Sequence, residues 1–344
     1  MRILLILTAA TSAAVFANPV QAQWQTVQPG GDTVCSDGSP YRFFVHPGDP
    51  AKLLVEFEGG GACWSAETCE LDVFTRRITT DPTQAARQNQ LQGIYDRTRA
   101  ENPLRDFTHV YVPYCTGDLH WGNVTQSYTG TTGRFTVHHR GAINAQAAVS
   151  WAYENVPAPT QLVVAGCSAG GYGATAWSAH LMAHYPGASA AHLADSAAGV
   201  VPEGFFSRAL NDWGIQHSPA WPNAIPSLSL DRLDVAHASL PDMYDGIAGF
   251  FPLSVFSQYN TLQDSTQTFF YLLAGAPPAG WSAGMQESVA RIRSANANFV
   301  SYTAPGTQHC VINRPEFYTT RVGNVLLTDW VRDLVTTHHP PNVP

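Results

Sequence analysis

The residues with the clearest chemical meaning form the pattern G-x-S-x-G at Gly166–Gly170, with Ser168 at its centre. The apolar run at 161–165 predicts a strand before the pattern, and residues 170–185 indicate a helix after it. A serine on a sharp turn between a buried strand and a helix exposes its hydroxyl, and the flanking glycines allow that turn. The helix N-terminus also favours a negative charge that develops nearby. The pattern predicts a nucleophile, and the plainer alternative is a chance match in a chain with 28 glycines.

A serine hydroxyl is a good nucleophile only beside a base, and the base needs a carboxylate that orients it. His309 is the candidate base, because it lies in a loop between the last predicted strand and a C-terminal helix. The alternative for this histidine is an ordinary position in a solvent-exposed loop. Asp195 and Asp264 both lie beside predicted strands and in the chain order serine, acid, histidine. The residue pattern leaves the acid open between these two.

Cleavage of an ester by a serine also needs N–H donors for the oxyanion that forms on the substrate. One donor is the backbone amide of Ala169, directly after the serine. The triplet Gly59-Gly60-Gly61 follows the apolar run at 53–57, and its backbone can approach a substrate closely. A flexible turn is the alternative, but a turn does not need three glycines beside a buried strand. We therefore expect the other donors in this glycine loop.

Two cysteines flank the predicted nucleophile and base. Cys167 directly precedes Ser168, and Cys310 directly follows His309. If the serine and the histidine lie within hydrogen-bond reach, their chain neighbours come within disulfide range. We therefore predict a Cys167–Cys310 bridge, with two unrelated buried thiols as the alternative.

The other four cysteines give weaker signals. Cys63 and Cys69 are close enough in sequence to pair locally, whereas the pairing of Cys35 and Cys115 stays open. The total is even and no CxxC pair occurs, so a zinc ribbon or a thioredoxin-like site is disfavoured.

The N-terminus predicts an export signal. Met1-Arg2 gives a positive start, Ile3–Phe16 is an apolar run, and Val20-Gln21-Ala22 has the pattern of a cleavage site. We predict a signal peptide at 1–22, cleavage after Ala22, and a secreted or periplasmic protein in which disulfides can form. The alternative, a membrane anchor, needs a longer apolar run. No second apolar stretch is long enough to cross a membrane.

Strands and helices are expected to alternate along the chain. The expected strands are 41–45, 53–57, 109–112, 161–165, 190–194, 269–273 and 299–303. The expected helices are 79–99, 138–155, 170–185 and 322–335. This alternation predicts an α/β fold with a mostly parallel, doubly wound sheet and helices on both faces. We expect a single domain at 23–344, with the Pro- and Trp-rich segment 207–252 as a cap or insertion.

Composition and charge exclude several classes of protein. With 44% hydrophobic and 13% charged residues, the chain does not have the composition of a disordered protein. Its formal net charge is −8 and it has no basic run, so nucleic acid is set aside as a partner. The HExxH motif is absent and His138-His139 has no third ligand in the pattern, so no metal or organic cofactor is implied. We expect a monomer.

A set of motifs occurs in one order along the chain. They are VEFEGGGACWSAETC at 55–69, VPYCTGD at 112–118, GCSAGGYG at 166–173, LADS at 193–196, QYNTLQDSTQ at 258–267 and QHC at 308–310. Together they resemble the pectin acetylesterase and Notum family of α/β-hydrolases, from about residue 31 to the tail. The resemblance implies an α/β-hydrolase fold, with Ser168 as the nucleophile and His309 as the base. It implies Asp264, not Asp195, as the acid.

The same resemblance implies the oxyanion donors Gly60, Gly61 and Ala169. The chain departs from the family at Ala62, near which the relatives carry a bulky residue, and along the stretch 118–128. These departures touch the pocket and therefore bear on the substrate. Within that stretch, the acidic and histidine side chains either line the acyl site or hold a turn; these are Asp118 and His120.

The combined hypothesis is an exported serine carboxylesterase that hydrolyses short acyl esters. By resemblance, its substrate is an O-acetyl group on a pectin-like polysaccharide. A feruloyl or aryl esterase or a polyester depolymerase is the alternative, and Trp213, Trp221 and Trp281 are expected as exposed aromatic side chains that would suit it. Outside the enzymes, the alternative is a carbohydrate- or lipid-binding protein on a hydrolase scaffold, against which the full set of site residues argues.

Overall fold

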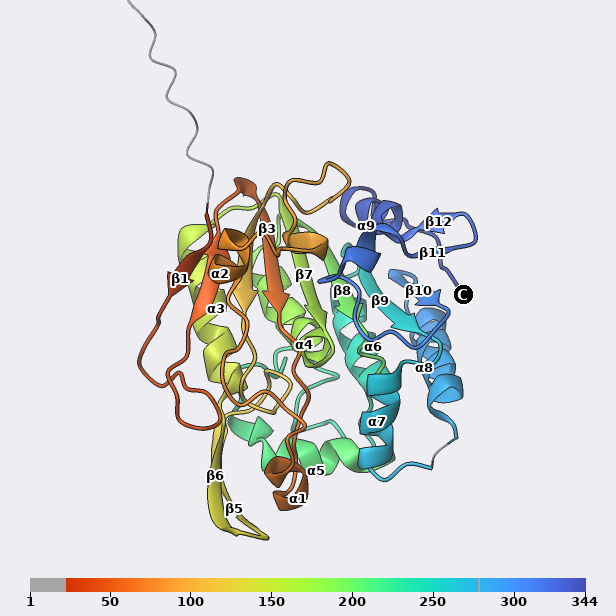
Figure 1. Cartoon of the computed structure of the whole chain (residues 1–344). Coiled ribbons are helices and arrows are strands. Elements are labelled where there is room, and N and C mark those ends of the chain that lie inside the picture. Colours follow the sequence, from red (N-terminus) through yellow and green to blue (C-terminus); the bar gives the residue numbers. More distant parts are fainter. Residues whose placement is uncertain (1–22, 278) are drawn as a thin grey trace, which may run out of the picture.

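An eight-stranded sheet runs through the middle of the protein (Figure 1). The computed structural model describes residues 23–277 and 279–344, so the predicted signal peptide lies outside the described residues. The order of the strands is β1-β2-β4-β3-β7-β8-β9-β10. Their bounds are β1 Gln25–Val27, β2 Phe43–His46, β3 Asp49–Phe57, β4 Phe107–Val112, β7 Gln161–Cys167, β8 Ser189–Asp195, β9 Phe256–Thr261 and β10 Phe299–Ala304. Only the pairs β1–β2 and β2–β4 are antiparallel, so the expected mostly parallel sheet is confirmed.

Helices cover both faces of this sheet. Their bounds are α1 Ala66–Glu70, α2 Pro82–Arg87, α3 Gly141–Asn155, α4 Ala169–His184, α5 Phe205–Asp212, α6 Leu240–Phe250, α7 Ser265–Leu273, α8 Trp281–Ala295 and α9 Leu327–Thr336. Successive side chains of a strand point to opposite faces. Leu53 and Val55 of β3 pack in the core that also holds residues of α3, α4, α6 and α8, whereas Leu54 packs in the core that holds Trp330 of α9.

Smaller elements surround the end of the sheet where the parallel strands finish. The hairpin of β5 (Val124–Gly130) and β6 (Gly133–His139) extends from the body beside α1. Helices α1, α5 and α7 gather below the sheet in Figure 1, at the end to which β3 points. Ligands of parallel α/β sheets bind at the carboxyl ends of the strands, so this is the end that positions a site.

Two expected helices are shorter in the structure. The helix expected at 79–99 is limited to α2, which Asp81 caps by accepting the N–H groups of Thr83 and Gln84. The segment lacks regularly spaced apolar residues that could hold a longer helix on the core. The helix expected at 322–335 begins later, because Gly323 has a φ of 55° in the turn between β11 (Arg321–Val322) and β12 (Val325–Leu326).

The strand expected at 269–273 is wrong, because these residues lie in α7. The Asp264 side chain caps this helix by accepting the N–H groups of Thr266 and Gln267. Phe269 and Leu272 are partly exposed rather than buried in the sheet. The strand of this region is instead β9, whose six residues are all buried.

The segment expected as a cap, 207–252, lies between β8 and β9 and holds most of α5 and all of α6. Helix α6 packs on α4 and α8 beside the sheet. The role of the segment as a cap and the single-domain boundaries stay predictions. In the part of the chain that the structure describes, no helix combines the length and the apolar character that a membrane crossing needs.

Candidate active site

Ser168 lies on the turn between β7 and α4, with φ 56° and ψ −124°. A positive φ is unfavourable for a residue with a side chain and occurs where the surroundings enforce it. The glycines on either side make the tight turn possible. A Cβ on Gly166 would lie 2.1 Å from the carbonyl oxygen of Gly170, and one on Gly170 would lie 1.9 Å from that of Phe57. The N–H of Ser168 donates to the carbonyl of Asp195 at 2.8 Å, which ties the turn to β8.

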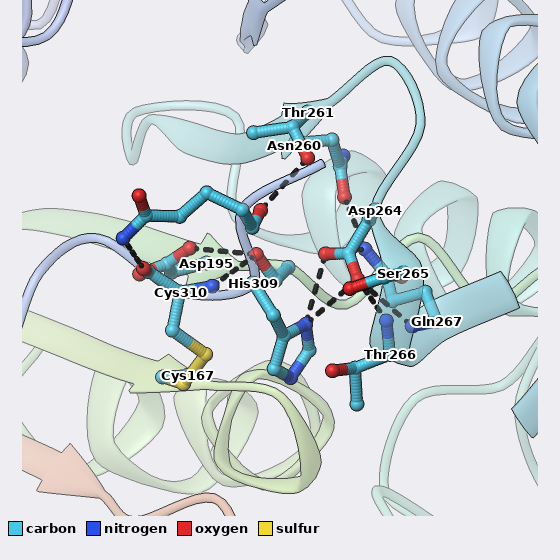
Figure 2. Close-up of polar contacts among 12 residues, drawn as sticks. Cys167, Asp195, Asn260, Thr261, Asp264, Ser265, Thr266, Gln267, His309 and Cys310 are labelled. Carbon is cyan, nitrogen blue, oxygen red and sulfur yellow. Dashed lines mark hydrogen bonds and ion pairs between the residues drawn. A yellow bond between two sulfur atoms is a disulfide. The ribbon is translucent and has the colours of Figure 1, made fainter. Parts of the chain in front are cut away.

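Asp264 and His309 lie in direct contact at the ends of β9 and β10 (Figure 2). Nδ1 of His309 lies 3.0 Å from Oδ1 and 2.8 Å from Oδ2 of Asp264. The Asp264 side chain is 0% exposed and that of His309 17%, so the carboxylate is screened from water while the ring reaches the surface. This contact orients the ring and leaves Nε2 for another partner.

Ser168 and His309 line the same cavity. Within the described residues, Oγ of Ser168 makes no hydrogen bond to Nε2 of His309. Such bonds are often long or poorly aligned without a substrate and tighten when one binds. The two side chains therefore share a site.

The cavity is enclosed mainly by apolar side chains. A volume of about 70 Å³ is open to the centre of a water molecule. Its aromatic lining comes from α4, α5, α7, the start of α8 and neighbouring loops: Trp64, Tyr172, Phe205, Phe206, Trp213, Phe270, Tyr271 and Trp281. Few polar side chains face the cavity besides the serine and the histidine, among them Ser196 and Gln267.

The glycine loop packs directly against the Ser168 turn. A Cβ on Gly59 would lie 2.5 Å from the carbonyl oxygen of Cys167 and 2.9 Å from Cβ of Ser168. Gly61 lines the cavity, and its φ of 78° is one that glycine adopts readily. Among the described residues, no acceptor is present for the N–H of Gly60 or Gly61.

Ala169 also lines the cavity and is the first residue of α4. Its N–H lacks a partner within the helix, as at every helix N-terminus. Within the part of the chain that the structure describes, three amides without an acceptor therefore belong to the loop and the turn that meet at Ser168. Their oxyanion role stays a prediction.

The structure joins all six cysteines in disulfides. Cys167 is bonded to Cys310, which connects the Ser168 turn to the loop that carries His309. Cys63 is bonded to Cys69, and Cys35 to Cys115, the pair that the sequence left open.

Two groups of cysteine and histidine side chains are close enough to suggest a metal site, namely Cys63, Cys69 and His139, and Cys167, His309 and Cys310. Metal ligation by cysteine requires a thiolate. In both groups the two sulfurs are bonded to each other, so neither offers thiolates.

Among the described residues, no hydrogen bond joins Asp195 to the His309 ring, which bonds to Asp264 instead. Its carboxylate accepts the backbone N–H groups of Val311 and Ile312 at 2.6 and 2.9 Å. Burial raises the pKa of Asp195 to about 6, while these N–H groups and the nearby His309 oppose the rise. The structure therefore places Asp264 against the histidine ring and Asp195 against the backbone that follows it.

Asp118 and His120 hold a turn and do not line the cavity. The Asp118 carboxylate accepts the N–H groups of His120 at 3.2 Å and of Gly141 at 2.7 Å. Nε2 of His120 donates to the carbonyl of Glu58, directly before the glycine loop. Burial lowers the pKa of His120 to about 4, so the ring is neutral at pH 7.

The expectation of exposed tryptophans is wrong. Trp213, Trp221 and Trp281 are all buried. The Trp213 indole N–H donates to the carbonyl of Cys63, and the ring packs edge-on against Trp121. Trp213 and Trp281 face the cavity rather than the outer surface.

Sequence reasoning missed two polar residues of the site. Gln267 donates from Nε2 to Oδ2 of Asp264 at 3.1 Å, and Ser196 accepts the N–H of Cys310 at 3.0 Å. Both lie in motifs that the sequence singled out, three residues after the predicted acid and one after Asp195. The sequence motifs contain both residues, but their contacts depend on how β8, β9 and the His309 loop pack together.

Comparison with known proteins places these features in a family. The model of the pectinacetylesterase family matches residues 17–208, more than half of the chain. The chain belongs to the pectinacetylesterase family. The matched part includes the glycine loop and the Ser168 turn, and the Asp264 and His309 segments lie beyond it.

Curated relatives and solved structures extend this comparison. The chain is 31% identical over 100 residues to the palmitoleoyl-protein carboxylesterase NOTUM of Schmidtea mediterranea and to notum2 of Xenopus laevis. These alignments cover 28% of this chain and about a fifth of either relative, 19% and 20%.

The structure of the Wnt deacylase Notum from Drosophila matches with a TM-score of 0.61 and 16% sequence identity. This match covers 94% of the chain and 96% of that structure. At this identity the likeness establishes the fold, which is that of an α/β-hydrolase.

Proposed function

We propose that this protein is a carboxylic ester hydrolase in which Ser168 is the nucleophile, His309 the base and Asp264 the acid. The observation that carries the proposal is the cavity that Ser168 and His309 share, with Asp264 bound to Nδ1 of the histidine. Membership of the pectinacetylesterase family supports ester hydrolysis. The carboxylesterase names of the relatives support it as well.

The reaction follows from the roles of these side chains. Oγ of Ser168 attacks the ester carbonyl while Nε2 of His309 takes its proton, and Asp264 stabilises the imidazolium. The N–H groups of Gly60, Gly61 and Ala169 hold the oxyanion. The C–O bond breaks, the alcohol leaves with the proton from His309, and a water molecule then releases the acid from the serine by the same route.

The substrate we propose is a short acyl ester, specifically an O-acetyl group on a pectin-like polysaccharide. The volume of about 70 Å³ is well below the roughly 300–1,000 Å³ of pockets that enclose drug-sized ligands. A small acyl group enters such a cavity, and the sugar chain stays outside it. The family's name supports acetyl as the acyl group.

A second candidate is a larger apolar or aromatic acyl group. The aromatic lining of the cavity favours it, because such walls bind apolar groups through burial. The relatives are named for the removal of a palmitoleoyl group from protein. For this chain, that substrate would require the cavity to open further.

The test is acetate release from acetylated pectin, with p-nitrophenyl acetate and p-nitrophenyl esters of longer acids in parallel. Ser168→Ala serves as the blank. Release from pectin and from the acetyl ester, both absent in the variant, supports the proposal down to the substrate class. Preference for longer or aryl esters with no pectin activity would replace acetyl by the second candidate. Binding without turnover of any ester, unchanged in Ser168→Ala, would favour a binding protein instead.

We also propose that the protein is secreted or periplasmic and acts as a monomer. Three disulfides fit a protein that folds in an oxidising compartment. The cleavage site after Ala22 is tested by sequencing the N-terminus of the exported protein, which should begin at Gln23.

A further inference from the structure

Asp195 is fully buried at the end of β8 and makes an unusual set of contacts. Its Oδ2 accepts the N–H groups of Val311 at 2.6 Å and Ile312 at 2.9 Å. Its Oδ1 accepts the hydroxyl of Ser196 at 3.0 Å, and that hydroxyl accepts the N–H of Cys310 at 3.0 Å. Two neighbouring side chains therefore hold three consecutive backbone amides.

These amides belong to the three residues directly after His309, so the contacts fix the main chain that follows the histidine. Figure 2 shows the arrangement: Asp264 faces the imidazole ring, whereas Asp195 lies beside the Cys310 backbone. One buried carboxylate thus contacts the His309 ring, and a second holds the backbone amides two and three residues after it.

The main-chain groups of Asp195 and Ser196 also bond to the other parts of the site. The carbonyl of Asp195 accepts the N–H of Ser168 at 2.8 Å. The N–H of Ser196 donates at 2.7 Å to the carbonyl of Tyr259 on β9, the strand that leads to Asp264. Because β8 lies between β7 and β9 in the sheet, its last residue and Ser196 directly after it contact the segments of all three candidate groups.

The charge of Asp195 is also placed near the histidine. In the described part of the chain no ion pair joins Asp195 to a lysine or an arginine. Burial raises the pKa of Asp195 to about 6, although the attraction to His309 lowers it. The other titratable groups that face this region are Tyr259 of β9 and Asp264. A negative Asp195 also attracts the positive charge that the imidazole ring carries once it has taken the proton of Ser168.

We propose that Asp195 is the positioning residue of the base: its carboxylate fixes the loop that carries His309, and its charge stabilises the imidazolium. The inference rests on the proposed function, in which His309 carries the proton during acylation. Asp264 orients the ring, and Asp195 holds the backbone and adds a second negative charge.

The test is Asp195→Asn, which keeps the shape and one oxygen for the two amides but removes the charge. We expect kcat to fall about 10-fold with KM unchanged. The acid limb of kcat/KM should move down by ~0.5–1 pH unit, because the imidazolium loses an attracting charge. The signals of the His309 ring are assigned by comparison with His309→Gln. NMR titration of this ring without substrate should show the same downward shift of its midpoint.

The matched control is Asp118→Asn. Asp118 is also fully buried, accepts two backbone N–H groups and one hydroxyl, and burial raises its pKa to about 6. A merely structural role predicts the same outcome for both variants. The proposal predicts that only Asp195→Asn shifts the pKa of His309.

The outcomes separate this inference from the proposed function. Ester turnover that Ser168→Ala abolishes, combined with an unshifted His309 and an unchanged kcat in Asp195→Asn, overturns the inference alone. No turnover of any ester combined with the NMR shift overturns the proposed function and keeps the electrostatic link.

A second variant covers the case in which Asp195→Asn does not fold. Ser196→Ala retains the charge and removes the link to the Cys310 amide. It should lower kcat several-fold and leave the His309 pKa in place. Unchanged kcat in this variant would contradict the positioning role.

Discussion

Asp264 has two roles in this chain, because one carboxylate both caps α7 and contacts His309. Its Oδ1 accepts the N–H groups of Thr266 and Gln267 at 3.0 and 2.8 Å, which fixes the carboxylate at the helix N-terminus. Nδ1 of His309 approaches the same group. The orientation of the histidine therefore depends on a helix cap, which ties the site to local folding of α7.

Replacing Asp264 with asparagine should separate these two roles. Asparagine is as good an N-cap as aspartate, so the free energy of unfolding should change by less than about 1 kcal/mol. Activity should fall about 10⁴-fold, because an amide cannot favour the required tautomer or balance the imidazolium charge. Steady-state kinetics on p-nitrophenyl acetate and urea unfolding measure the two effects.

Asp81→Asn is the control for this substitution. Asp81 caps α2 in the same way and does not line the candidate cavity. Its replacement should leave activity unchanged. If Asp264→Asn kept more activity than Asp195→Asn, the assignment of the acid would be reversed.

The sequence identifies residues whose role is local and fails for those whose role depends on tertiary contacts. G-x-S-x-G marks Ser168 because the turn, its glycines and the following helix are adjacent in the chain. Asp195 and Asp264 both end a strand region, and only the approach of the His309 loop distinguishes a carboxylate at the ring from one at the backbone. The residue pattern could not supply that distance.

At the scale of elements, the turn after β7 packs its backbone directly against the backbone at the end of β3. The Gly170 Cα faces the carbonyl of Phe57 at the end of β3, where a Cβ would lie 1.9 Å from the oxygen. The turn therefore depends on the adjacent strand as well as on its own sequence.

Gly170→Ala should destabilise the protein by about 3 kcal/mol or more, because neither backbone can move without shifting a central strand. Gly187→Ala is the matched control, since a Cβ there meets nothing within 4 Å. Urea unfolding of the two variants measures the difference. Equal stability of both would show that the turn is looser than described.

The disulfides give a second prediction at this scale. In the chain-entropy model, a bridge stabilises more when it closes a longer loop. Cys167–Cys310 spans 143 residues and Cys63–Cys69 spans 6. Replacing the first pair with serines should cost about 5 kcal/mol and the second about 2 kcal/mol, measured by chemical unfolding. A larger loss from the short bridge would contradict this ranking.

Residues 269–273 were expected as a strand and lie in the helix α7. The run FFYLL at 269–273 has the composition of a strand, but its side chains are divided between the cavity and the surface. The Asp264 cap, which starts a helix before the run, was the local signal for the correct element.

At the scale of the molecule, the core contains histidines that burial keeps neutral. His192 is 0% exposed, its Nδ1 has no hydrogen-bond partner among the described residues, and burial lowers its pKa to about 3. His120 and His139 have pKa values lowered to about 4 for the same reason. Burial raises the pKa values of Asp118 and Asp195 to about 6. The effect of these carboxyls on the pH dependence of stability is therefore opposite to that of the buried histidines.

Acid should therefore destabilise the folded state through His192. An unfolded histidine binds a proton below about pH 6.5, whereas the folded one does so only near pH 3. Between these values the unfolded state holds more protons, so stability falls as pH falls, by up to about 1.4 kcal/mol per pH unit. Comparison with His192→Gln isolates this group from the opposing carboxyls.

The measurement is urea unfolding of both proteins at several values between pH 4 and pH 7. The pH slope should be smaller in His192→Gln by about 1 kcal/mol per unit. His184→Gln, at an exposed position of α4, should keep the slope of the natural protein. Parallel slopes for all three proteins would contradict a neutral buried His192.

The alternation of strands and helices predicted the mostly parallel sheet, because strand and helix periods are local properties, but it placed one strand at 269–273 instead of at β9. The disposition of the cavity was beyond that reasoning, since its walls come from α4, α5, α7 and α8, which are distant in sequence. Trp213 and Trp281, which were expected at the surface, line this cavity.

The most direct test of the account is covalent labelling of the nucleophile. The protein is treated with an alkyl fluorophosphonate, which reacts with activated serines, and its peptides are mapped by mass spectrometry. The account predicts one label per chain, on Ser168, with none on Ser168→Ala and slower labelling of Asp264→Asn. Labelling of another residue, or no labelling of correctly folded protein, would contradict the assignment of Ser168, His309 and Asp264 as an active site.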